Sequence, residues 1–164
     1  MKKLIITVLA LAILLPCTFA QAPAAGAGVG ADAQLFSIEL GLPIGYRLSD
    51  GALVSGRAFG LNITVADNFL VGFSSTQIGS TATPTAYNAL RLSYTIMPLL
   101  GTSIFIGRTA TSTAAGLGFY STIAQSRNAA GLGTGLRLRV DYFFESTDLA
   151  AGSVVFTTSV LFGM

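Results

Sequence analysis

Apolar side chains recur at every second position through the end of the chain, over residues 152–164. The positions between them hold mostly serine, threonine and glycine. Successive side chains of a β-strand point to opposite faces, so this alternation predicts a strand with one apolar face and one small, polar face. Because chain ends usually fray unless they are held, we expect this strand to be paired in a sheet. Its apolar positions are Val154, Phe156, Val160, Phe162 and Met164.

Seven earlier segments repeat this alternation, and turn residues or polar stretches separate them. We therefore predict eight strands, with the longest polar connection at 76–86. An even number of strands brings both chain ends to one side, so the connections after strands one, three, five and seven are expected to face the cell exterior. The alternating segments are, approximately, 35–48, 53–66, 69–74, 89–96, 104–106, 116–123, 136–145 and 152–164.

Pro43 falls in the middle of the first alternating segment. Every strand of a closed barrel is paired on both sides, and proline has no N–H group to donate to a ladder. We therefore expect a bulge or a local opening of the sheet at Pro43.

The hydropathy of the chain favours a membrane protein. Its mean hydropathy is +0.70, and only 10% of its residues are charged. Beyond the first twenty residues, however, no run of 18 apolar residues exists, and a membrane-spanning helix needs about 20. The other structure that satisfies all its backbone groups in lipid is a closed β-barrel. The predicted fold class is therefore all-β, an eight-stranded antiparallel up-and-down transmembrane β-barrel.

Residues 1–20 have the organisation of a Sec-type signal peptide. Lys2 and Lys3 precede an apolar stretch, and Thr18-Phe19-Ala20 places small residues around a cleavage site before Gln21. A lipoprotein signal cut before Cys17 is the alternative. Residues 21–34 are rich in alanine and glycine and are predicted to form a flexible leader. The barrel is predicted to occupy 35–164.

The charges that follow the signal peptide balance. This part contains seven arginines and seven acidic residues, and it has no lysine, histidine or cysteine. A basic surface for nucleic acid is therefore not indicated. Without histidine or cysteine the chain shows no metal site, and no cofactor is expected. Histidine is the commonest general base in hydrolytic and acyl-transfer sites, and this part of the chain has none, so we do not expect an enzyme. A carboxylate pair formed by Glu39 and Asp141 is the remaining catalytic alternative.

The two strand faces carry different charged residues. Most charged positions within the strands share the small-residue face, and buried charges must be paired. We therefore predict a charge cluster in the lumen. Two arginines and several tyrosines are instead expected near the membrane interfaces, Tyr87 and Tyr94 among them. The predicted cluster comprises Glu39, Arg91, Arg137, Arg139, Asp141 and Glu145, and the principal interface residues are Arg57, Arg108, Tyr46 and Tyr142.

Together these features resemble the small outer-membrane β-barrels of the OmpX, OmpW and OmpA-membrane-domain type. The resemblance covers residues 35–164 and concerns architecture, because no specific sequence motif is shared. It implies a location in the outer membrane of a diderm bacterium. It also implies contact with outer-membrane lipid and insertion by the barrel-assembly machinery. The oligomeric state is left open.

Three functions are compatible with these residues. The first is a structural barrel or a narrow pore that passes small solutes or a small hydrophobic ligand, as the many glycines on the inner face suggest. The second is a surface-exposed adhesin or interaction barrel. The third is a soluble periplasmic β-sandwich or lipocalin-like binder, whose apolar faces would turn inward.

Overall fold

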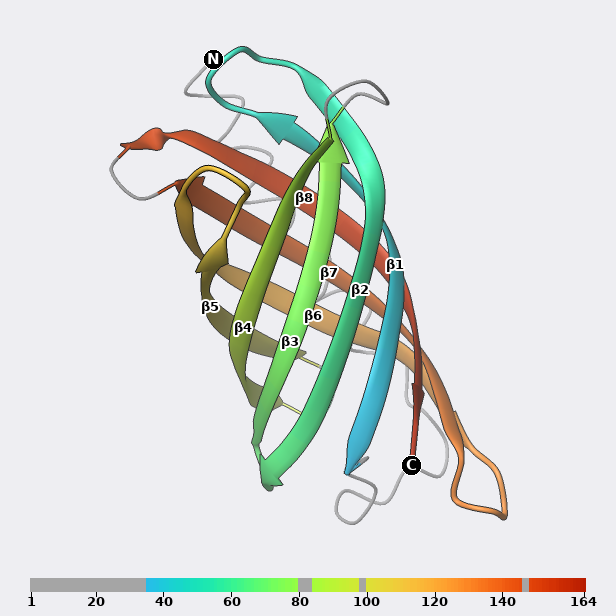
Figure 1. The fold of residues 1–164 in the computed structure, drawn as a ribbon. Coiled ribbons are helices and arrows are strands. Elements are labelled where there is room, and N and C mark those ends of the chain that lie inside the picture. The colour runs from blue at the N-terminus through green and yellow to red at the C-terminus, as the bar shows by residue number, and fades with distance from the viewer. Residues whose placement is uncertain (1–34, 80–83, 98–99, 146–147) are drawn as a thin grey trace.

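The computed structural model describes residues 35–79, 84–97, 100–145 and 148–164, without the side chains at 145 and 148–151. Within these residues eight strands form a closed barrel in which each strand pairs with the next and β8 pairs with β1. All pairings are antiparallel, and the strands run obliquely around the barrel (Figure 1). The strands are β1 (Phe36–Arg47), β2 (Leu53–Ala66), β3 (Phe69–Gly79), β4 (Pro84–Met97), β5 (Leu100–Arg108), β6 (Thr113–Arg127), β7 (Gly133–Glu145) and β8 (Asp148–Gly163).

The predicted fold class is confirmed, and so are the number and order of the strands. The predicted polar connection at 76–86 is wrong, since β3 continues to Gly79 and β4 begins at Pro84. Only 80–83 separates these two strands. Ser75 and Gln77 are polar residues at positions of β3 that face outward, so the apolar–polar alternation in the sequence stops there. The backbone pairing with β2 and β4 nevertheless continues through both residues. The predicted signal peptide at 1–20, with Cys17, and the predicted leader at 21–34 lie outside the described residues.

Pro43 opens the sheet locally, as predicted. Between β1 and β2, Gly41 pairs with Ala58 and Ile44 pairs with Ser55, but Leu42 and Pro43 have no partner in β2. The register is the same on both sides of this gap, so no extra residue is inserted and the irregularity is an opening of the ladder. On its other side Pro43 pairs with Thr157 of β8. The interruption is therefore confined to the seam between β1 and β2.

The two ends of the barrel differ. Phe36 of β1 and Gly163 of β8 lie at the end that we call the terminal end, where β2–β3, β4–β5 and β6–β7 also turn. The opposite, distal end carries the connections 48–52, 80–83, 109–112 and 146–147. In the part of the chain that the structure describes, no helix is long and apolar enough to cross a membrane.

Large apolar side chains cover the outer wall on every strand. Most of them are exposed by between 37% and 82% of their surface, far more than a soluble protein tolerates over so wide an area. The inner side chains of the same strands are buried and mainly small or polar. The apolar faces thus turn outward. Outward-facing examples, one for each strand in order, are Leu40, Ile63, Val71, Leu92, Ile104, Phe119, Leu138 and Val160.

Candidate functional site

A network of ion pairs crosses the lumen and joins β4 to β7 and β7 to β1. Asp141 of β7 accepts two hydrogen bonds from Arg91 of β4, with Nη1 at 2.9 Å from Oδ1 and Nη2 at 3.1 Å from Oδ2. Arg91 Nη1 also donates to the Ser103 hydroxyl, at 2.8 Å. This two-point contact between a guanidinium and a carboxylate is the strongest geometry for such a pair. It ties β4 to β7 across the barrel interior.

Arg139 links this pair to a second carboxylate. Its Nε lies 2.7 Å from Oδ2 of Asp141, and its Nη1 donates to Oε1 of Glu39 at 2.9 Å. Glu39, on β1, also accepts a hydrogen bond of 2.7 Å from the Ser159 hydroxyl of β8. Arg139 therefore bridges the two carboxylates, and each carboxylate has more than one partner.

Arg137 extends the network toward the terminal end. Its Nη1 lies 3.4 Å from Oε2 of Glu39, and its guanidinium stacks over the Tyr120 ring at 4.5 Å from the centroid. The Tyr120 hydroxyl in turn lies 3.0 Å from the Thr95 hydroxyl. An arginine on an aromatic face gains a cation–π attraction, which supports the longer ion pair.

Burial explains why these charges occur together. Asp141 is 0% exposed, Glu39 2%, Arg91 4% and Arg139 5%. A single charge in such surroundings would cost several kcal/mol, whereas a charge with good partners is tolerated. Both carboxylates of the suggested catalytic pair are thus engaged by arginines. Among the described residues, no three histidine, cysteine or acidic side chains are arranged to hold a metal ion.

The other candidate residues are distributed over the barrel. The side chain of Glu145 lies outside the described residues, although its backbone pairs with Ala114. Arg57 and Arg108 are exposed, and both lie close to the distal ends of their strands. Tyr46 and Tyr142 are partly buried near the same end. The structure therefore brings together five of the lumenal candidates, Glu39, Arg91, Arg137, Arg139 and Asp141, and leaves the two outer arginines apart from them.

An aromatic layer lies in the lumen on the distal side of the ion pairs. Phe143 is 1% exposed, and its ring lies 4.6 Å from that of Tyr87 and 4.8 Å from that of Phe105, measured between centroids. Ile78 and Val155 complete the layer, at 1% and 0% exposure. The suggestion that Tyr87 sits at a membrane interface is wrong. Tyr87 shares the inward parity of Ala89 and Arg91, and that signal was available in the sequence.

The inner glycines provide space for large side chains from neighbouring strands. A Cβ atom on Gly118 would collide with Oδ1 of Asp141, and one on Gly116 would collide with the ring of Phe105. A Cβ atom on Gly101 would collide with the ring of Tyr120. At these positions the small residues do not leave an open channel, because a bulky partner lies against each of them.

A closed barrel with an apolar outer wall, a polar interior and paired internal charges defines the class of the protein. It is a small eight-stranded transmembrane β-barrel of the bacterial outer-membrane type, in contact with the lipid bilayer. The architecture that the sequence resemblance implied is thus confirmed. The alternative of a soluble binder is wrong, because that protein would bury the apolar faces that here point outward.

Comparisons with known proteins find structural matches at low sequence identity. A designed transmembrane β-barrel matches with a TM-score of 0.48 at 13% identity, over 78% of this chain and 95% of that chain. Ail, the attachment invasion locus protein of Yersinia pestis, matches with a TM-score of 0.46 at 13% identity, over 79% and 96%. The outer membrane protein AlkL matches with a TM-score of 0.36 at 12% identity, over 88% and 94%. No protein-family model and no curated protein sequence matches the chain.

A charge placed on the outer wall tests the orientation of the barrel. Leu92 lies outward in the middle of β4, opposite Val71 and Ile104. Leu92→Arg is expected to lower the free energy of unfolding in lipid vesicles by about 2–4 kcal/mol, because arginine at mid-depth must leave water. The matched variant Ile96→Arg, close to the terminal end of the same strand, should cost only about 0–1 kcal/mol. Denaturant titration of both variants measures the difference, and equal small costs would contradict the membrane orientation.

Proposed function

We propose that this protein is a structural barrel of the outer membrane whose lumen is closed to solutes. The supporting observation is the stack of buried side chains across the interior. The aromatic layer around Phe143 lies next to the ion-pair network, on its distal side. Phe143, Val155 and Asp141 are each at most 1% exposed. An eight-stranded barrel is just wide enough to be filled by side chains. A solute would have to displace both layers to pass.

The other functions have less support from the described residues. The pore rested on inner glycines such as those at 41, 72 and 118. A Cβ atom at these three positions would collide with the side chains of Thr157, Asn62 and Asp141 respectively. A surface adhesin would need external area, yet the distal connections span only 48–52, 80–83, 109–112 and 146–147. Catalysis by Glu39 and Asp141 would require at least one carboxylate that is not paired with arginine, and both are paired. Insertion by the barrel-assembly machinery stays a prediction from the sequence resemblance.

Conductance in a planar bilayer tests the closed lumen. The refolded protein is expected to give no steady single-channel current, because no water-filled path crosses the aromatic and ionic layers. A general porin inserted by the same procedure serves as the positive control. A shift in gel mobility between unboiled and boiled samples verifies that the protein is folded. Discrete, reproducible current steps from folded protein would contradict the proposal and restore the narrow pore.

A further inference from the structure

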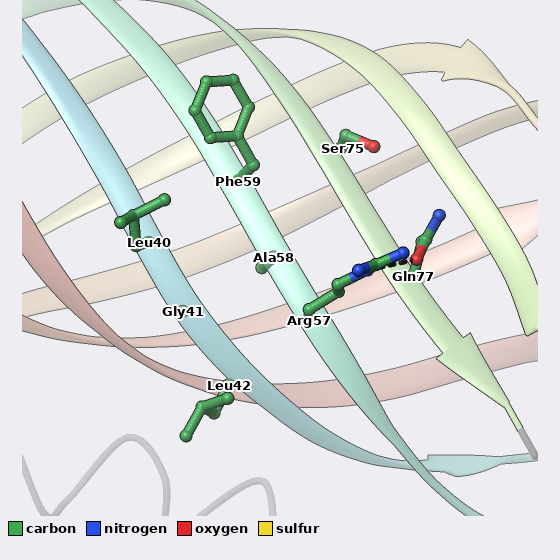
Figure 2. Close-up of a pocket in the computed structure, with 8 residues that line it drawn as sticks. All are labelled: Leu40, Gly41, Leu42, Arg57, Ala58, Phe59, Ser75 and Gln77. Carbon is green, nitrogen blue, oxygen red and sulfur yellow. Dashed lines mark hydrogen bonds between the residues drawn. The ribbon is translucent and has the colours of Figure 1, made fainter. Parts of the chain in front are cut away.

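A depression of about 500 Å³ lies on the outer wall of the barrel, across β1, β2 and β3. Figure 2 shows its two kinds of lining residue. Arg57, Ser75 and Gln77 supply the polar part, and Leu40, Leu42 and Phe59 supply the apolar part. All six side chains belong to the outward-facing parity of their strands. The depression therefore opens toward the bilayer and not toward the lumen.

The sequence accounts for the position of the depression. Pro43 interrupts the ladder between β1 and β2, so Leu42 and Arg57 are not paired across the seam. On its other side β2 lies against β3 so closely at Gly56 that a Cβ atom there would collide with the carbonyl oxygen of Gln77. The strand is thus held toward β3 where it is released from β1. Gly41 and Ala58, both small, line the floor of the depression.

Arg57 is oriented as a receptor for an anion. Its Nε donates a hydrogen bond of 2.6 Å to Oε1 of Gln77, drawn as the dashed line in Figure 2. This bond holds the guanidinium of Arg57, on β2, against Gln77 of the neighbouring strand β3. No described carboxylate pairs with Arg57, so its charge has no counter-ion within the described barrel. An arginine that faces lipid needs such a counter-charge, and guanidinium groups bind phosphate through two parallel hydrogen bonds.

The apolar part continues from the cation toward the middle of the wall. Leu40, Leu42 and Phe59 are exposed by 50%, 71% and 37%. Arg57 lies four positions from Leu53, the distal start of β2, and the sequence predicts that it lies at a membrane interface. A positive group at headgroup level above an apolar surface complements one molecule, a lipid with a negatively charged headgroup.

We infer that this depression binds a lipid with a net negative, phosphate-bearing headgroup from the leaflet at the distal end of the barrel. The phosphate oxygens accept hydrogen bonds from the terminal nitrogens of Arg57. One acyl chain lies against Leu40, Leu42 and Phe59. This inference depends on the outward orientation of the wall and not on whether the lumen conducts.

Lipid retention in nanodiscs tests the inference. The protein is inserted into discs of phosphatidylcholine with a minor fraction of phosphatidylglycerol, and native mass spectrometry measures which lipid remains bound after release from the disc. Phosphatidylglycerol is expected to be enriched on the wild-type protein. Arg57→Gln should reduce that enrichment at least about fivefold, because it removes the charge at headgroup level.

Arg108→Gln is the matched control. Arg108 is also exposed, also lies at the distal end of its strand and makes no ion pair with a described carboxylate, but it is outside the depression. Its substitution should leave the enrichment within about twofold of the wild-type value, because the bound lipid does not contact it. Equal losses in the two variants would show general attraction to a positive surface and would overturn a specific site.

A second variant tests the acyl contact separately. Leu42→Ser should weaken retention of phosphatidylglycerol, since the chain loses apolar surface, while Arg57 is left intact. Excess glycerol phosphate, which carries the headgroup without chains, should fail to displace the lipid. Full displacement by glycerol phosphate, or unchanged retention in Leu42→Ser, would overturn the assignment of a lipid to the depression. The gel-mobility shift on boiling confirms that each variant is folded.

Discussion

Asp141→Asn is expected to lower the free energy of unfolding by about 3–5 kcal/mol. The substitution keeps the size of the side chain but removes the charge that Arg91 meets with two hydrogen bonds. Arg91 then stays buried without a counter-charge, and Arg139 retains only Glu39. Breaking a buried pair on one side costs far more than the pair contributes, because the remaining charge cannot reach water. Urea titration of the refolded protein, followed by circular dichroism, measures the change.

Asp50→Asn is the matched control for Asp141→Asn. Asp50 also pairs with an arginine, since Arg47 Nη1 lies 3.1 Å from its Oδ2, but this pair is exposed at a turn. Its loss should cost only about 0–1 kcal/mol. Replacing both members of the buried pair, as Arg91→Met with Asp141→Leu, should recover much of the stability lost in Asp141→Asn. If Asp141→Asn costs as little as Asp50→Asn, the ion network does not hold the barrel together.

Phe143→Ala is expected to cost about 3–5 kcal/mol, the usual loss for a buried phenylalanine. The ring fills the centre of the aromatic layer between Tyr87 and Phe105. The surrounding walls are strands held by ladders on both sides, so they cannot collapse into the space that is left. The same urea titration measures the effect.

Phe119→Ala provides the comparison for Phe143→Ala, because Phe119 lies on the neighbouring strand and is 45% exposed toward the outside. Lipid chains can fill the space that its ring leaves, so its loss should cost clearly less than that of Phe143. Equal costs would show that the interior is no better packed than the outer surface, and the aromatic layer would lose its role in closing the lumen.

The alternation of side chains was sufficient to predict the fold. A period of two identifies strands, and high hydropathy without a helical span leaves a closed barrel as the structure that satisfies the backbone in lipid. Pro43 was equally informative, because the chemistry of one residue forces an opening in the ladder. Alternation failed where polar residues occupy the outer face. Ser75 and Gln77 ended the apolar period in β3, and Ala86 and Asn88 occupy the outer positions at the start of β4, so the full lengths of both strands were missed.

The partners inside the lumen could not be read from the alternation. Parity puts Glu39, Arg91 and Asp141 on one face, but it does not tell which carboxylate meets which arginine. Arg91 and Asp141 are 50 residues apart, and their contact depends on the register accumulated over β4 to β7. The aromatic layer has the same origin. Tyr87 and Phe143 meet across the interior because of the stagger of the strands, which no local pattern encodes.

The seam between β1 and β8 closes the barrel wall. Eleven residue pairs close this seam, and the residues that it joins come from opposite ends of the chain. Glu39 accepts a hydrogen bond from the hydroxyl of Ser159, which is 120 residues away in the sequence. Strand β8 lies between β1 and β7, so it also positions the arginines of β7 near Glu39. Until β8 docks, both edge strands carry unpaired backbone groups, which lipid does not tolerate. Closure of the wall and neutralisation of Glu39 by the arginines of β7 therefore both depend on the docking of one strand, β8, against β1.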